Sequence, residues 1–117
     1  MGKLTTHVLD TAGGCPGAGI HIKLYRLDGG SVAFVLEART NDDGRVDAPL
    51  LDGDNLVAGD YLIEFAVGDY FRALGTELTE PAFLDIVPIR FGIADARSHY
   101  HVPLLISPYG YSTYRGS

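Results

Sequence analysis

Two histidines, His99 and His101, stand two residues apart in a stretch whose apolar side chains alternate. Side chains two residues apart on a β-strand point to the same face, so both imidazoles belong to one face, together with Pro103 and Leu105. An imidazole exchanges protons near neutral pH and also binds metal ions. This pair is therefore a candidate for general acid–base chemistry or for chelation. The opposite face carries an unbroken apolar set: Tyr100, Val102, Leu104 and Ile106.

The face that holds these histidines is too apolar for an ordinary exposed strand. A solvent-facing strand normally carries Lys, Glu or Thr, whereas here the neighbours are proline and leucine. We expect a subunit interface or a cleft over this face. The plainer alternative is a pair of exposed histidines on a surface strand. Metal binding by the pair would need a third ligand, and no spacing in the sequence supplies one.

Two more side chains, His7 and Arg45, could take part in proton transfer or in holding an anion. His7 lies in a short alternating stretch near the N-terminus, and alone it indicates little. Arg45 directly follows Asp42-Asp43-Gly44. An arginine in such a place is most often a solvated charge paired with nearby aspartates.

The last eleven residues, 107–117, contain three tyrosines and end in Tyr-Arg-Gly-Ser. One interpretation is an aromatic terminal strand packed into the fold. The other is a polar pocket that the terminal segment Tyr114-Arg115-Gly116-Ser117 closes.

The elements that must position these side chains are mostly β-strands. Short runs of alternating apolar residues, separated by Gly, Pro and Asp turn signals, predict strands over 4–10, 20–28, 32–40, 61–67, 87–93, 99–107 and 109–115, and a weak strand over 45–49. Pro88 indicates that its strand is an edge strand. One short helix is expected over 69–74, capped by Asp69 and ended by Gly75. About eight short strands at this spacing are typical of a β-sandwich.

Composition excludes several classes of protein. The 117 residues predict one domain over 1–117, and the formal net charge of −6 gives no support for binding nucleic acid. No apolar run is long enough to cross a bilayer and no signal segment stands at the N-terminus, so we expect no membrane partner and a cytoplasmic protein. The single cysteine, Cys15, forms no internal disulfide and has no neighbouring base, so we interpret it as a small loop residue.

Two long motifs stand at opposite ends of the chain. The first is His7-Val8-Leu9-Asp10 followed by Gly14-Cys15-Pro16-Gly17, and the second runs without a break from His99 to Ser117. With these motifs, and over essentially its whole length, the chain resembles the transthyretin-like family, specifically its 5-hydroxyisourate hydrolase branch. Two long motifs in the correct order make this a specific match.

The same family includes the thyroid-hormone carrier transthyretin, so the resemblance in fold does not settle the function. Where the carrier has lysine, glutamate and threonine, this sequence has His7, Arg45 and His101. The ending Tyr114 to Ser117 is that of the hydrolases. These positions favour the hydrolase, and a small-ligand carrier without catalysis is the alternative.

The resemblance implies an eight-stranded sandwich of two four-stranded sheets. It also implies a homotetramer, built as a dimer of dimers, with active sites in the groove where two dimers meet. The implied reaction is hydrolysis of 5-hydroxyisourate, a small molecule, without a metal or another cofactor. In it His7 and His101 would orient and deprotonate water, and Arg45 would bind the ring. The further residues expected at the substrate are Tyr114, Arg115, Ser117 and, as a second choice, His99.

Overall fold

The computed structural model describes residues 2–116. Its strands are β1 (Lys3–Asp10), β2 (Cys15–Pro16), β3 (His21–Asp28), β4 (Ser31–Arg39), β5 (Leu51–Asp52), β6 (Gly59–Ala66), β7 (Ile86–Ile93), β8 (Tyr100–Ser107) and β9 (Gly110–Thr113). The helices are α1 (Val67–Ala73) and a short 3-10 turn, η1 (Gly53–Asn55). The predicted all-β class with one short α-helix is confirmed. No helix within residues 2–116 has the length and apolar character needed to cross a membrane.

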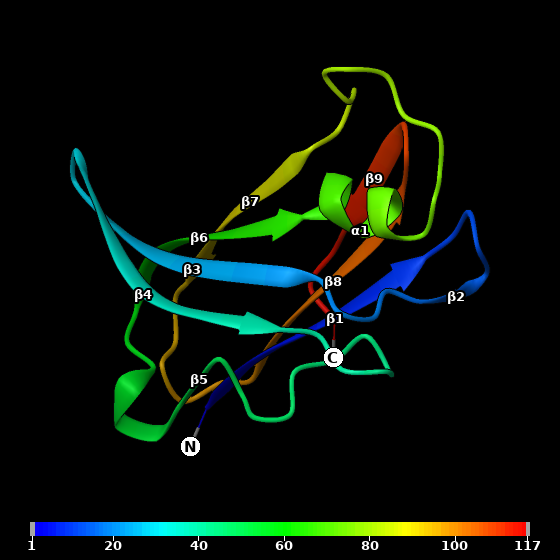
Figure 1. Cartoon of the computed structure of the whole chain (residues 1–117). Coiled ribbons are helices and arrows are strands. Elements are labelled where there is room, and N and C mark those ends of the chain that lie inside the picture. The colour runs from blue at the N-terminus through cyan, green and yellow to red at the C-terminus, as the bar shows by residue number, and fades with distance from the viewer. Residues whose placement is uncertain (1, 117) are drawn as a thin grey trace.

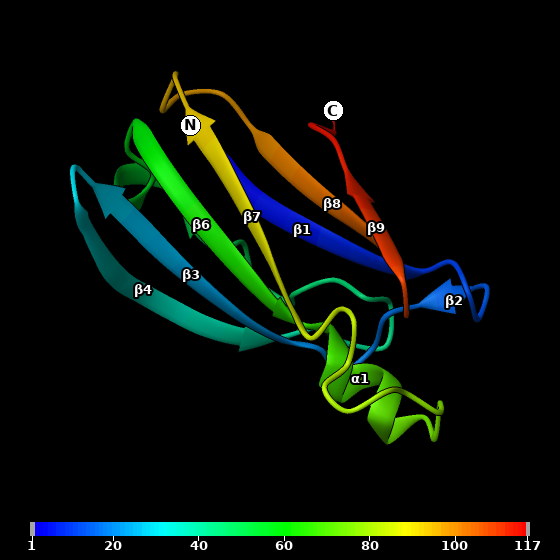
Figure 2. The ribbon, with the colours of Figure 1, turned by 90° about the horizontal axis from the view of Figure 1, so that it is seen from above.

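Two sheets pack across a shared apolar core, with α1 at one end (Figures 1 and 2). One sheet has the strand order β4-β3-β6-β7 and is antiparallel throughout. The other has the order β2-β1-β8-β9, and β5 also pairs with β1. In this second sheet β1 and β8 run parallel. The position of β7 at the end of its sheet confirms the edge strand predicted from Pro88.

The second sheet has five strands, one more than the resemblance implied, and the weak strand predicted over 45–49 is wrong. Arg45 forms only an isolated bridge with His7, and pairing with β1 resumes later, at Leu51. Pro49 lies between these two points, and proline has no N–H to donate to a ladder. The segment between Arg45 and Leu51 is therefore a loop, and backbone hydrogen bonds join both of its ends to β1.

Strict alternation in β1 and β8 separates the core from the outer face. Every second residue of β1 from Leu4 onward is buried, while Thr5, His7 and Leu9 are only partly buried. In β8 the predicted inward face is confirmed, since its four members are all buried. The shared core also takes its largest fully buried side chains, Tyr61 and Phe65, from β6.

The helix starts two residues earlier than predicted, and the predicted Asp69 cap is wrong. Its N-cap is Ala66, which makes no side-chain capping bond, because α1 follows directly from the end of β6. Asp69 instead pairs with Arg72 at 2.9 Å. The hydroxyl of Tyr70 donates to buried Asp10 at 2.8 Å, which ties the helix to β1. Burial and this carboxylate both raise the pKa of Tyr70.

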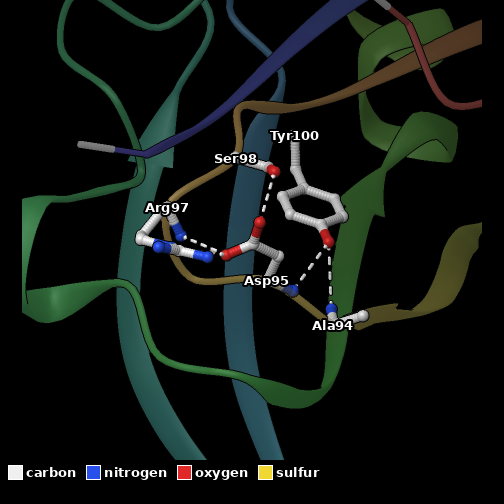
Figure 3. A network of polar contacts seen from close by, with 5 residues as sticks. All are labelled: Ala94, Asp95, Arg97, Ser98 and Tyr100. Carbon is white, nitrogen blue, oxygen red and sulfur yellow. Dashed lines mark hydrogen bonds and ion pairs between the residues drawn. The ribbon is translucent and has the colours of Figure 1, made fainter.

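The turn before β8 is held by a compact polar network (Figure 3). The hydroxyl of Tyr100 accepts hydrogens from the backbone N–H groups of Ala94 and Asp95, at 3.0 and 3.1 Å. The Asp95 carboxylate accepts from the backbone of Arg97 and from the hydroxyl of Ser98, and these bonds lower its pKa. The first residue of β8 is thereby fixed, which sets the position of His101 next along the strand.

Candidate active site

Parallel pairing of β1 with β8 brings the two sequence motifs together. The register places Thr5 opposite His101 and His7 opposite Pro103. These four side chains lie on the outer face of their sheet, because their strand neighbours are the core-facing residues. Two imidazoles from opposite ends of the chain thus share one surface.

A tight loop between β4 and β5 carries Arg45 to the same place. The backbone of Arg45 bridges to His7. The side-chain oxygen of Asn41 accepts two backbone hydrogens, from Asp43 at 2.9 Å and from Arg45 at 3.1 Å. Asn41 therefore fixes the loop that delivers Arg45.

This loop also sets the hydrogen position on His7. The Nε2 atom of His7 lies 2.9 Å from the backbone carbonyl oxygen of Asp43. A carbonyl oxygen only accepts hydrogen bonds, so Nε2 must carry the hydrogen. In the neutral ring Nδ1 is then the nitrogen free to take a proton.

The surroundings of His101 favour its neutral ring. Its partial burial disfavours the charged ring most strongly, and the positive charges of Arg45 and of protonated His7 add to this, so the pKa of His101 lies below 6.5. The backbone of Thr5 acts weakly in the opposite direction. A lowered pKa keeps the ring neutral to lower pH, so it favours the form of His101 that can accept a proton. The electrostatic effect of Arg45 and His7 on this ring also indicates that the three groups are close.

Arg45 is exposed, but it is not paired with an aspartate, as a charge at such a position commonly is. The ion pairs formed within residues 2–116 involve His21, Arg72 and Arg97, and none involves Arg45. Its charge is therefore available to an anionic group placed on this face.

Gly44 lets the Arg45 loop pack tightly against β1. Its carbonyl accepts the Val8 N–H at 2.8 Å, its φ is +77°, and an added Cβ would lie 2.3 Å from the Val8 carbonyl oxygen. Gly19 has a similar φ of +74° with open space around it.

We expect Gly44→Ala to lower the free energy of unfolding by about 2 kcal/mol more than Gly19→Ala. The left-handed backbone conformation strains both variants, whereas only in the Gly44 variant does the new Cβ collide with the backbone of β1. Urea unfolding of the two variants beside the wild type measures the difference. Equal losses would show that the loop yields freely and does not hold Arg45 in place.

The C-terminal tail reaches both faces of β8. The Gly116 N–H donates to the His101 carbonyl at 2.8 Å, and an added Cβ on Gly116 would lie 2.6 Å from the His101 ring. Arg115 turns the other way: its guanidinium carbon lies 4.1 Å from the centroid of the core-facing Tyr100 ring. Tyr114 is 61% exposed. Ser117, also expected at the substrate, lies outside the described residues.

The tail lines a cavity of about 350 Å³ on the inner side of β8. His7, His101 and Arg45 do not contribute to its wall. Tyr114 and Arg115 do contribute, so the structure does not bring Arg115 to the histidine pair. The remaining lining residues are Ile89, Arg90, Phe91, Gly92, Ala94, Tyr100, Val102 and Thr113.

The other two histidines, His99 and His21, make contacts that do not involve His7, His101 or Arg45. His99 is exposed and precedes β8, and its carbonyl accepts a hydrogen from Arg115. His21 pairs with Glu37 on the other sheet at 2.9 Å. Among residues 2–116, no three His, Cys, Asp or Glu side chains are gathered closely enough to hold a metal ion.

A family model gives the evolutionary context of this arrangement. The model described as the HIUase/Transthyretin family matches residues 4–116. The chain belongs to this family. A relative from Rhizobium meliloti (strain 1021), named 5-hydroxyisourate hydrolase 2, is 61% identical over 99% of this chain and 97% of its own length. The predicted family is therefore confirmed.

Solved structures of this family agree with the fold. A chain titled (S)-allantoin synthase superposes with a TM-score of 0.94 and 48% identity over 99% of this chain, which corresponds to 44% of that longer chain. The 5-hydroxyisourate hydrolase of Klebsiella pneumoniae superposes with a TM-score of 0.82 and 35% identity over the full length of both chains. Sea bream transthyretin in complex with thyroxine, at a TM-score of 0.87, 97% and 94% coverage and 23% identity, shows the shared fold alone.

Proposed function

We propose that this chain hydrolyses 5-hydroxyisourate with the cluster His7, Arg45 and His101. The observation that carries the proposal is the convergence of two imidazoles and an unpaired guanidinium on one sheet face. The relatives that share at least half of this sequence and bear the hydrolase name support the choice of substrate.

The reaction adds one water to a cyclic amide. A water oxygen attacks C6 of the six-membered ring while an imidazole takes its proton, and a C–O bond forms. The N1–C6 bond then breaks, and N1, the leaving atom, receives a proton from the imidazolium. C6 stays bonded to the rest of the molecule as a carboxylic acid, which releases its proton to solvent and becomes a carboxylate. His7 offers Nδ1 for the proton, and the lowered pKa of His101 favours a second neutral ring.

Arg45 stabilises the charge that develops on the C6 oxygen. A planar guanidinium donates paired hydrogen bonds to carbonyl oxygens and is already charged before the reaction. Removing such a donor from a hydrolytic site typically lowers the rate by about 10²–10³-fold. We further propose that Tyr114, Arg115, Ser117 and His99 shape the mouth of the site, Arg115 through its hold on the tail.

A carrier of the transthyretin type is the alternative function, and metal binding by the His99/His101 pair is a weaker one. Carbon-13 NMR of freshly made 5-hydroxyisourate distinguishes them, because only hydrolysis converts the C6 carbonyl signal into a carboxylate signal faster than in buffer. We expect fast conversion with the purified chain, with and without prior chelation. If the C6 signal converts no faster than in buffer, the carrier function is favoured. If chelation abolishes the fast conversion, a metal takes part in the reaction.

We also propose that the chain assembles as a homotetramer, a dimer of dimers. The strands β7 and β9 end their sheets, so each offers free backbone groups for pairing. Large apolar residues near these edges are exposed: Phe83, Ile86, Tyr109 and Tyr111. The outer face beside the histidines is a second apolar surface, to which the half-buried Leu9 and Leu105 contribute. Two distinct surfaces suit two kinds of interface.

Light scattering on the purified, active protein tests the assembly. We expect a particle of four times the 12.6 kDa chain mass. A fully active monomer would contradict the tetramer and would show that one chain completes the site.

A further inference from the structure

A threonine on β1 contacts the imidazole of His101. The Thr5 hydroxyl oxygen lies 2.8 Å from His101 Nδ1, and the two residues are opposite each other in the parallel ladder. A hydroxyl both donates and accepts, so it can bond Nδ1 whether or not that nitrogen carries a hydrogen. In either case this bond occupies Nδ1.

The tail restrains the same ring from another direction. A Cβ on Gly116 would lie 2.6 Å from Cδ2 and 3.2 Å from Cγ of His101, so the bare glycine backbone packs directly on the ring. A ring that is hydrogen-bonded at one edge and packed at another cannot rotate freely. The remaining nitrogen, Nε2, is left without a protein partner among residues 2–116.

We propose that Thr5 is a positioning residue, which orients His101 so that Nε2 is the nitrogen that exchanges a proton with the substrate or water. The inference rests on the proposed hydrolysis, in which His101 takes part. Thr5 itself touches no reacting atom, because its hydroxyl is engaged with Nδ1.

The bond also affects how His101 titrates. Hydrogen bonds to a charged group are roughly twice as strong as those between neutral groups, so the Thr5 hydroxyl favours the protonated ring. Loss of the hydroxyl should therefore lower the pKa of His101 further. The charged groups that face this ring are Arg45 and His7, and both already disfavour its protonation.

Thr5→Val removes the hydroxyl and keeps the shape, and Thr5→Ser keeps the hydroxyl. We expect Thr5→Val to lower kcat about tenfold with little change in KM, since misorientation of a catalytic group acts on the chemical step. The acidic limb of its pH–rate profile should move to lower pH by on the order of half a unit. Thr5→Ser should restore both.

Thr6→Val is the matched control. Thr6 is the next residue of β1, and its hydroxyl donates to β8 at the Val102 carbonyl at 2.7 Å, on the core side. This variant should lose thermal stability yet keep the wild-type pH profile. An unchanged kcat and pH profile in Thr5→Val would overturn the proposal.

Nitrogen-15 NMR of the four histidines separates this inference from the proposed function. We expect the His101 Nδ1 signal to show a hydrogen-bonded nitrogen in the wild type and in Thr5→Ser, and to lose this hydrogen-bond shift in Thr5→Val. Identical spectra would show that Thr5 does not orient the ring. A wild type that fails to hydrolyse the substrate would refute the proposed function, while these spectra would still decide the role of Thr5.

Discussion

Replacing His7 by Gln or His101 by Asn should reduce the catalysed hydrolysis of 5-hydroxyisourate by about two orders of magnitude or more. The amide of Gln reaches to about where Nε2 of His7 meets the Asp43 carbonyl, and that of Asn to about where Nδ1 of His101 meets Thr5. Each variant thus keeps the structural hydrogen bond and loses the ability to take a proton.

His21→Asn provides the control for these variants. His21 lies on β3 in the other sheet and pairs with Glu37, so its loss should leave turnover nearly unchanged. Initial rates of substrate decay, with circular dichroism to check folding, measure all three variants. Near-full hydrolysis by both cluster variants, while folded, would show that neither imidazole carries the proton.

Deletion of Tyr114 to Ser117 should abolish detectable turnover while the sandwich stays folded. The deletion begins after the end of β9 at Thr113, so no strand pairing within residues 2–113 is lost. It removes the Gly116 backbone from the His101 ring and the Arg115 guanidinium from Tyr100. The lost cation–π contact costs about 0.5–1 kcal/mol of stability, which a folded domain tolerates.

Gly116→Ala separates the two effects of the deletion. It keeps the tail and adds one carbon against the His101 ring, so it should lower the rate and leave the melting temperature close to that of the wild type. If the deletion instead unfolds the protein and Gly116→Ala is fully active, the tyrosine-rich tail is structural and does not serve the site.

Local patterns predicted the strands well because their physical cause is local. The two-residue alternation in β8 arises from one buried face, and the same alternation is readable in the sequence. Pro88 predicts an edge strand because proline has no backbone N–H to donate to a neighbouring strand, and β7 does lie at the end of its sheet. The predicted helix start lies two residues after the observed one, and the predicted Asp69 cap is wrong because β6 continues directly into α1.

The composition of the site depended on contacts that no local pattern encodes. Thr5 and His101 are 96 positions apart, and only the parallel pairing of β1 with β8 makes them neighbours. Contact between two strands so distant in sequence is decided by the packing of the whole sandwich. The inward turn of Arg115 onto Tyr100 likewise depends on the end of β9, whereas the motif alone suggested a place at the substrate.

The rate at which the ultraviolet absorbance of freshly generated 5-hydroxyisourate decays tests the central claim most directly. It should be measured in buffer, with the wild type, and with the double variant His7→Gln/His101→Asn. We expect the wild type to accelerate the decay strongly and the double variant to return it close to the spontaneous rate, since residues that act as one unit leave little catalysis when both are removed. A wild type that leaves the spontaneous rate unchanged, or a folded double variant that matches the wild type, would contradict the account.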